Sequence, residues 1–245
     1  MQADRVTPIS DVERALVVMA HPDDVDFGAA GTVAGWTKAG TEVSYCLCTS
    51  GDAGGFDDTP RERMAGLRED EQRAAAEELG VRDVTFLGYP DGRLTPSIEL
   101  RRDITRQIRR VRPQRLLTSS PEIWWRRFGA SHPDHRAAGE AALAAVYPDA
   151  RNPFAHPELL SEEGLEAWSV AEVWLMASPD ERQNHAVDVT DVLDRKLAAL
   201  RAHQSQTAHL DDLESRIRGW GRALARTAEL PAGRLAEVFQ VVSLR

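Results

Sequence analysis

The sequence has few cysteines, and this scarcity excludes a disulfide framework. Only Cys46 and Cys48 occur in 245 residues. They alternate within the apolar run EVSYCLCT, so the period of a strand points both thiols to the same face, where a disulfide between them would be badly strained. We therefore expect two buried core residues rather than a disulfide or a thiolate metal site.

The sequence also lacks an excess of positive charge and a long apolar segment. Its formal net charge is −9 at pH 7, and its pI is about 5.3. Proteins that bind nucleic acid usually carry a basic stripe or patch, so we expect no nucleic-acid partner. No stretch reaches the roughly 18 apolar residues of a membrane span, and residues 1–20 lack the features of a signal peptide. We expect a cytoplasmic protein without a membrane partner.

Apolar runs alternate with helical patterns along the first part of the chain. Residues 15–20, ALVVMA, form a continuous apolar run, which is typical of a strand buried on both faces of a parallel sheet. The patterns that follow are a helix in 27–40, a strand in 42–49, a helix in 60–80, a strand in 83–89, a helix in 97–111, a strand in 115–120 and a helix in 132–146. This alternation predicts a Rossmann-like, doubly wound α/β fold: a mostly parallel sheet with helices on both faces.

The rest of the chain continues without a linker. We expect further strands in 171–177, 185–190 and 235–244, with mostly helical structure in 191–229. The segment 148–168, rich in proline and charge, is expected to be a surface excursion over a site. Because no change of composition marks a boundary, residues 1–245 are expected to form a single domain.

The tripeptide His-Pro-Asp occurs twice, each time followed by another potential metal ligand. AHPDD follows the strand in 15–20, and HPDH follows the strand in 115–120 after a loop. Each copy would also suit a helix start, with proline and aspartate in the first turn. In the common strand order 3-2-1-4-5, however, the first and fourth strands are neighbours, and ligands bind at their carboxyl ends. We therefore expect the copies to meet and to gather His21, Asp23, Asp24, His132, Asp134 and His135.

A cluster of carboxylates and imidazoles is costly unless a cation organises it. Catalytic zinc takes about three nitrogen or oxygen ligands and leaves one position for water, which His21, Asp24 and His135 would satisfy. Asp23 adjoins Asp24, so its side chain diverges and can face the water. His132 shares a helix face with His135 and can meet the substrate. We expect one Zn²⁺ per chain; Fe²⁺ and Co²⁺ stay open because this donor set accepts several divalent ions.

These motifs resemble those of a known family, the LmbE-like or PIG-L deacetylases, which are zinc-dependent enzymes that remove the acetyl group from N-acetylglucosamine-type sugars. The resemblance covers most of the chain and extends to TSGDAGG, LREDEQRAAAEELG, LGYPDG and KLAALRAHQSQ, in the same order. It implies a Rossmann-like fold with zinc at His21, Asp24 and His135. It also implies hydrolysis by a metal-activated water, with Asp23 as general base and protonated His132 stabilising the oxyanion.

The resemblance further implies contacts with the substrate. Arg68 and Asp91 match positions that contact sugar hydroxyls, and Asp52 stands where many members have glutamate. By residue type alone, Arg68 could instead pair with neighbouring acids on a solvated helix, and YPDG is a good β-turn by itself.

Four more residues enter the expected site or its surroundings. Asp134 is expected to orient an imidazole. The loop PEIWWRRFG is the candidate for specificity, because Trp124 and Trp125 could stack on a substrate, although they could also pack the loop down. His203, in AHQSQ, could edge the pocket but is expected to be structural on an amphipathic helix.

Three classes of function stay open. A deacetylase would act on a small amidated sugar or glycoconjugate, such as a monosaccharide amide, a thiol-sugar S-conjugate or an acylated natural product. A nucleotide-binding or methyl-transfer enzyme would use GAAGTVAG as a glycine-rich turn, but these glycines come too late and lack the G-x-G-x-x-G spacing. A non-catalytic, metal-stabilised sugar-binding domain would have no use for the spare carboxylate of Asp23. A homo-oligomer stays open as well.

Overall fold

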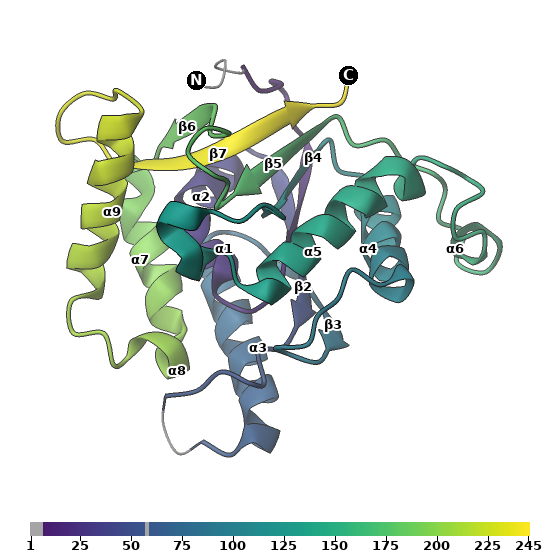
Figure 1. Cartoon of the computed structure of the whole chain (residues 1–245), viewed down its shortest axis with the longest axis horizontal. Coiled ribbons are helices and arrows are strands. Elements are labelled where there is room, and N and C mark those ends of the chain that lie inside the picture. The colour runs from purple at the N-terminus through teal and green to yellow at the C-terminus, as the bar shows by residue number, and fades with distance from the viewer. Residues whose placement is uncertain (1–6, 57–58) are drawn as a thin grey trace.

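A seven-stranded sheet with helices on both faces forms the centre of the computed structural model, which describes residues 7–56 and 59–245 (Figure 1). The strands are β1 (Arg14–Met19), β2 (Glu42–Thr49), β3 (Asp83–Tyr89), β4 (Arg115–Ser119), β5 (Glu172–Met176), β6 (His185–Asp188) and β7 (Ala236–Ser243). Their order is β3-β2-β1-β4-β5-β7-β6. The first five strands are parallel, and β7 runs antiparallel to β5 and β6. The predicted doubly wound, mostly parallel sheet is confirmed, and β1 adjoins β4.

The helices connect these strands at the expected places. They are α1 (Asp24–Gly28), α2 (Ala30–Lys38), α3 (Arg61–Glu78), α4 (Ile98–Val111), α5 (Pro133–Ala144), α6 (Glu158–Ser161), α7 (Leu193–Ala202), α8 (Gln204–Thr207) and α9 (Leu213–Thr227). Three short irregular helices are η1 (Trp125–Ala130), η2 (Ala145–Ala150) and η3 (Thr190–Val192). The one helix predicted in 27–40 is two helices, because Ala29 leaves the helical conformation with φ −145°. None of the helices in the described ranges has the length and apolarity to cross a membrane.

The sheet is buried on both faces, as the apolar runs predict. In β2, Tyr45 and Leu47 belong to the core on one face, while Cys46 and Cys48 belong to the core on the other. Both thiols are buried and free, which confirms their prediction as core residues. The core that contains the cysteines also takes up the apolar stripe of α4, where residues such as Ile104 are fully buried. Burying a side chain of this size contributes about 1.5–3 kcal/mol.

A buried ion pair holds the junction between α1 and α2. The carboxylate of Glu237, in β7, accepts the backbone N–H groups of Gly31 at 3.0 Å and Thr32 at 2.7 Å, at the start of α2. Lys196 Nζ, in α7, donates to Glu237 at 2.6 Å and to the carbonyl oxygen of Phe27, near the end of α1, at 2.8 Å. Removing one partner of such a buried pair costs about 3–5 kcal/mol. The chain thus fixes α1, which carries Asp24, from two distant elements.

The segment 148–168 does not cover a site, so that expectation is wrong. Its chain folds against α4, where Arg109 donates to the carbonyl oxygens of Asp149, Asn152 and Ala155 at 2.9 to 3.0 Å. None of its residues lines the main cavity, which is described below. The segment is a surface excursion that lies next to α4, beyond the C-terminal end of α5 (Figure 1).

Candidate active site

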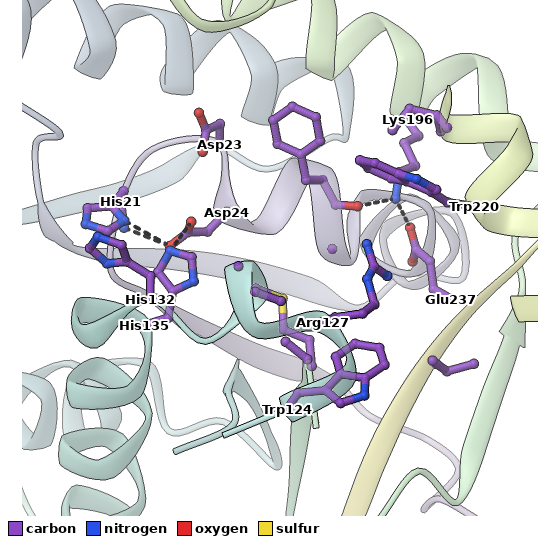
Figure 2. A pocket seen from close by; sticks show the side chains of 18 of the residues that line it. His21, Asp23, Asp24, Trp124, Arg127, His132, His135, Lys196, Trp220 and Glu237 are labelled. Carbon is purple, nitrogen blue, oxygen red and sulfur yellow. Dashed lines mark hydrogen bonds and ion pairs between the residues drawn. The ribbon is translucent and has the colours of Figure 1, made fainter. Parts of the chain in front are cut away.

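The two His-Pro-Asp copies meet at the carboxyl ends of β1 and β4. His21 follows β1, whereas His132 caps the start of α5 and His135 lies in the first turn of that helix. Each pair of these rings has centroids 5.2 Å apart, and one nitrogen from each ring lies within 4.8 Å of the other two. Figure 2 shows the three imidazoles grouped at one end of a pocket, next to Asp23 and Asp24.

The carboxylate of Asp24 joins this group of rings. Its Oδ1 lies 3.0 Å from His135 Nε2, and its Oδ2 lies 3.7 Å from His21 Nδ1 and accepts the His21 backbone N–H at 2.9 Å. Asp24 and His21 are each 8% exposed. Two imidazoles and one carboxylate that converge in this way are the donors that a catalytic zinc ion takes.

A second layer of carboxylates stands behind His21. Its Nε2 lies 2.9 Å from Asp91 Oδ1 and 3.2 Å from Asp134 Oδ2. Asp91 also accepts the backbone N–H of Ala53 at 2.9 Å, and Asp134 accepts that of Gly92 at 2.7 Å. His21, Asp91 and Asp134 form a second group whose ligand atoms lie within 4.8 Å of one another. Because backbone hydrogen bonds already hold its two carboxylates, this group is better suited to orient the His21 ring than to bind an ion.

The site favours positive charge. Burial by itself would lower the pKa of His21, but its hydrogen bonds with Asp24 and Asp91 raise that pKa to about 11. Burial would raise the pKa of Asp24, yet His135 and His21 hold it far below its usual range. Carboxylates that favour a proton on an imidazole also favour a metal cation in its place, and metal binding releases that proton. The residues therefore fit a divalent metal ion.

Asp23 has an unusual backbone conformation next to this group. Its φ is +80°, in the left-handed region that few residues other than glycine adopt. Gln72, in α3, accepts its backbone N–H at 2.9 Å, and Arg68 Nη2 donates to Asp23 Oδ2 at 3.1 Å and to the carbonyl oxygen of Pro22 at 2.8 Å. Burial raises the pKa of Asp23 to about 6, although Arg68 opposes the rise. A carboxylate with such a pKa is suited to act as a general base near neutral pH.

A chain of buried hydrogen bonds supports Asp23 from behind. Gln72 Nε2 donates to Asp26 Oδ2 at 2.9 Å, and His203 Nε2 lies 2.9 Å from that same oxygen. Gln72, Asp26 and His203 are completely buried. His203 does not line the cavity, which agrees with the structural role expected for it. Asp26 and Gln72 link it to Asp23. The sequence motifs contain Gln72 and His203, but no spacing signal shows that they meet.

Gln72→Leu tests this support. The change removes both hydrogen bonds of the amide and keeps a similar volume. We expect kcat to fall by about 10–100-fold, with little change in KM or bound metal, because the Asp23 backbone loses the acceptor that fixes it. Steady-state kinetics and metal analysis measure this split. Gln107→Leu, at a buried glutamine in α4, is the matched control; equal losses in both variants would mean a general loss of stability instead.

The ring of His132 has a defined orientation. Its Nδ1 accepts the backbone N–H of Asp134 at 3.2 Å, so in the neutral ring the hydrogen is on Nε2. Burial lowers the pKa of His132, and the neighbouring His135 and His21 lower it further. The lowered pKa favours the neutral ring over the expected protonated form, and a neutral ring still donates one hydrogen bond through Nε2.

The group of three imidazoles and its neighbouring carboxylates lies at one end of a cavity of about 860 Å³. The polar residues at this end are His21, Asp23, Asp24, Arg68, Asp91, His132 and His135. Arg68 is 4% exposed, so the alternative of a solvated helix face is wrong. Asp52 does not line the cavity: its carboxylate pairs with Arg61 at 3.1 Å and accepts the Asp91 N–H at 3.3 Å. Its expected substrate contact is therefore corrected to support of the loop that carries Asp91.

The two tryptophans of the loop before α5 have different surroundings. Trp124 is 7% exposed and lines the cavity, where Arg127 lies over its ring at 5.2 Å. Trp125 is 76% exposed and stacks on Phe128 at 6.0 Å. Trp124 is therefore the member of the pair that can face a substrate.

The glycines of GAAGTVAG lie in helices rather than in the turn after β1. Gly28 is the last residue of α1, and Gly31 lies in α2. A Cβ on Gly28 would meet the side chain of Met176, and one on Gly31 would meet Val189. These glycines permit close packing, so the reading as a glycine-rich nucleotide turn is wrong.

The chain is similar to known proteins in sequence and in structure. The family model of GlcNAc-PI de-N-acetylase, PIG-L, matches residues 16–146. A diacetylchitobiose deacetylase of Thermococcus kodakarensis is 34% identical over 200 residues, which cover 81% of this chain and 72% of that protein. A probable N-acetyl-alpha-D-glucosaminyl L-malate deacetylase 2 of Bacillus cereus is 32% identical over 226 residues, which cover 88% and 94%. The structure of N,N'-diacetylchitobiose deacetylase from Pyrococcus horikoshii, complexed with its inhibitor, is similar with a TM-score of 0.85, 29% identity and coverage of 95% of this chain and 85% of that one.

Proposed function

Because the chain belongs to the PIG-L family of GlcNAc-PI de-N-acetylases, we propose that it hydrolyses the acetamide of an N-acetylglucosamine-type sugar or conjugate. The reaction breaks a carbon–nitrogen bond outside a peptide and releases acetate and the amino sugar. The observation that supports it best is the position of Asp23 and His132 beside the group of His21, Asp24 and His135, at one end of a large cavity.

His21, Asp24 and His135 would hold one divalent ion, and we propose Zn²⁺. Their nitrogen and oxygen donors are those of catalytic zinc sites, although Fe²⁺ and Co²⁺ accept the same set. When bound, the ion supplies a Lewis acid that polarises the amide carbonyl and lowers the pKa of water. Asp91 and Asp134 hold His21 in position through its Nε2.

The remaining steps belong to side chains of the protein. Asp23 takes a proton from the attacking water while Arg68 holds its carboxylate. His132 donates a hydrogen bond from its Nε2–H group to the oxyanion of the tetrahedral intermediate. The proton on Asp23 then passes to the nitrogen as the carbon–nitrogen bond breaks, so the amine departs neutral and Asp23 is again a carboxylate.

We place the sugar on the side of the cavity that contains Arg68 and Asp91. Both line it together with the backbone of Ala53 and Gly54, and they offer donors and acceptors for hydroxyl groups. Trp124 supplies an aromatic wall. One domain, residues 1–245, would carry the whole site; residues 1–6 and 57–58 lie outside the described ranges.

A hydrolysis panel tests the proposal. The purified protein, loaded with zinc, is incubated with N-acetylglucosamine, diacetylchitobiose and N-acetylglucosaminyl malate, and released primary amine and acetate are both measured. We expect the two products in equal amounts from at least one compound, loss of turnover with a chelator and recovery with zinc. Saturable binding of a sugar without turnover of any amide would instead support the non-catalytic sugar-binding domain.

A further inference from the structure

The left-handed backbone of Asp23 is held by a side chain from another helix. Few residues other than glycine adopt a φ of +80°, and such a conformation persists only where the surroundings fix it. The carbonyl oxygen of Asp23 accepts the N–H groups of Asp26 at 2.9 Å and Phe27 at 3.0 Å, at the start of α1. Its own N–H group, however, donates to Gln72 in α3. The conformation of Asp23 therefore depends on the orientation of the Gln72 amide.

The Gln72 amide has one orientation that satisfies both of its neighbours. A backbone N–H group can only donate, so the Asp23 N–H requires the Gln72 Oε1 atom, which lies at 2.9 Å. A carboxylate can only accept, so Asp26 Oδ2 requires the Gln72 Nε2 atom, at 2.9 Å. A half-turn of the amide would place two donors against each other at Asp23 and two acceptors against each other at Asp26. Asp26 therefore fixes which end of Gln72 faces Asp23.

His203 is the partner that fixes Asp26. Its Nε2 lies 2.9 Å from Asp26 Oδ2, the same oxygen that binds Gln72. The other oxygen, Oδ1, has no hydrogen-bond partner within residues 7–56 and 59–245. Burial by itself would lower the pKa of His203, but its hydrogen bond with Asp26 raises that pKa, which agrees with a hydrogen on Nε2. Because both side chains are completely buried, bulk water cannot replace a lost donor, and removal of His203 would leave Asp26 with Gln72 alone.

His203 itself has a fixed position at the junction of α7 and α8. It ends α7 and begins α8. Its carbonyl oxygen accepts the backbone N–H groups of Gln206 at 3.0 Å and Thr207 at 2.9 Å, and also the Thr207 hydroxyl at 2.9 Å. The packing of α7 against α1 and α3 brings the ring to Asp26. His203 thus lies outside residues 16–146, the part that the family model matches, and reaches Asp23 only through side chains inside that part.

We infer that His203 is a positioning residue for Asp23: through Asp26 it fixes the orientation of the Gln72 amide, and so the conformation of the general base. The inference rests on the proposed function, which makes Asp23 that base. Because His203 does not line the cavity, its loss should lower kcat and leave KM and bound metal unchanged. Hydrogen-bond partners behind a reacting group typically contribute 10–100-fold, and for a residue this far from the base we expect about tenfold.

Two amide substitutions of His203 test the inference. The side chain of His203→Gln is long enough to place an N–H group near the position of Nε2, whereas that of His203→Asn is one methylene shorter and does not reach Asp26. We expect His203→Gln to keep kcat within about threefold of the wild type and His203→Asn to lose about tenfold, with KM and zinc content unchanged in both. Equal kcat values for the two variants would overturn the inference. His203→Leu, which has no donor, replaces His203→Asn if that variant does not fold.

A double variant shows whether His203 acts through Gln72. In a protein that already has Gln72→Leu, adding His203→Asn should change kcat by no more than about twofold, because the amide that His203 orients is gone. A merely structural role would instead multiply the two losses and overturn the inference. His156→Asn is the matched control, because His156 Nε2 lies 3.2 Å from Asp149 Oδ2 in another histidine–aspartate pair, in a segment that does not line the cavity. This control should leave kcat unchanged.

Hydrogen exchange at the Asp23 amide separates this inference from the proposed function. The Asp23 N–H exchanges with solvent when its hydrogen bond to Gln72 opens. NMR of the zinc-loaded proteins should show exchange about tenfold faster in His203→Asn and Gln72→Leu, and wild-type exchange in His203→Gln and His156→Asn. This pattern in a protein that hydrolyses no amide would support the role of His203 and reject only the deacetylase. Amide hydrolysis by the wild type, with one Asp23 exchange rate in all of these proteins, would reject only the role of His203.

Discussion

Asp23→Asn is expected to lower kcat by about 10³-fold while the protein keeps its fold and its metal. The amide oxygen of asparagine can still accept the hydrogen bond that Arg68 donates to Oδ2, and the backbone N–H can still donate to Gln72. The variant therefore loses the ability to take a proton and little else. General-base catalysis contributes roughly 10²–10⁴-fold, which sets the size of the expected loss.

Asp52→Asn is the matched control for Asp23→Asn. Asp52 lies in the loop after β2, close to Asp91 in space, but it does not line the cavity. Its kcat should stay within a few-fold of the wild type. Steady-state kinetics and metal analysis of the wild type, Asp23→Asn and Asp52→Asn test whether Asp23 is the general base. A kcat for Asp23→Asn within tenfold of the wild type would assign the proton transfer to another group, and a loss of metal would make Asp23 a ligand.

The sequence shows the strands and their order well because parallel strands are buried on both faces. Continuous apolar runs such as residues 15–20 therefore stand out, and right-handed connections leave few arrangements for them. The sequence pattern does not predict the break between α1 and α2. Its cause is Glu237, whose carboxylate caps α2 from 206 residues away, and no local pattern carries that information.

The same distinction between local patterns and distant contacts applies to the residues of the candidate site. The convergence of His21, Asp24 and His135 could be predicted because each lies in a short motif that follows a strand, His135 after an intervening loop, and the two strands could be predicted to be neighbours. The place of Gln72 and His203 behind Asp23 could not be predicted from the sequence, because only the packing of α3 against α7 brings them there. The error at Asp52 has a local cause: its carboxylate turns toward Arg61 and the Asp91 backbone, a direction that residue type cannot predict.

His135→Ala is expected to abolish both metal binding and turnover. His135 Nε2 lies 3.0 Å from Asp24 Oδ1, and its side chain is 21% exposed in the first turn of α5. Alanine is a good helix former, so the helix should persist while one of three ligands is lost. Elemental mass spectrometry after dialysis should find about one equivalent of zinc in the wild type and less than roughly a tenth of that in the variant.

The control for His135→Ala is His209→Ala, because His209 is exposed and packs on Phe56 with ring centroids 4.2 Å apart. This variant should keep its zinc and its kcat. If His135→Ala kept its zinc instead, His135 would not be a required ligand, and one other candidate is the group of His21, Asp91 and Asp134, whose ligand atoms also lie within 4.8 Å of one another. Asp91→Asn would then release the metal. With the ion at His135, Asp91→Asn should weaken metal affinity by only about 10–100-fold, because its carboxylate orients the His21 ring without binding the ion.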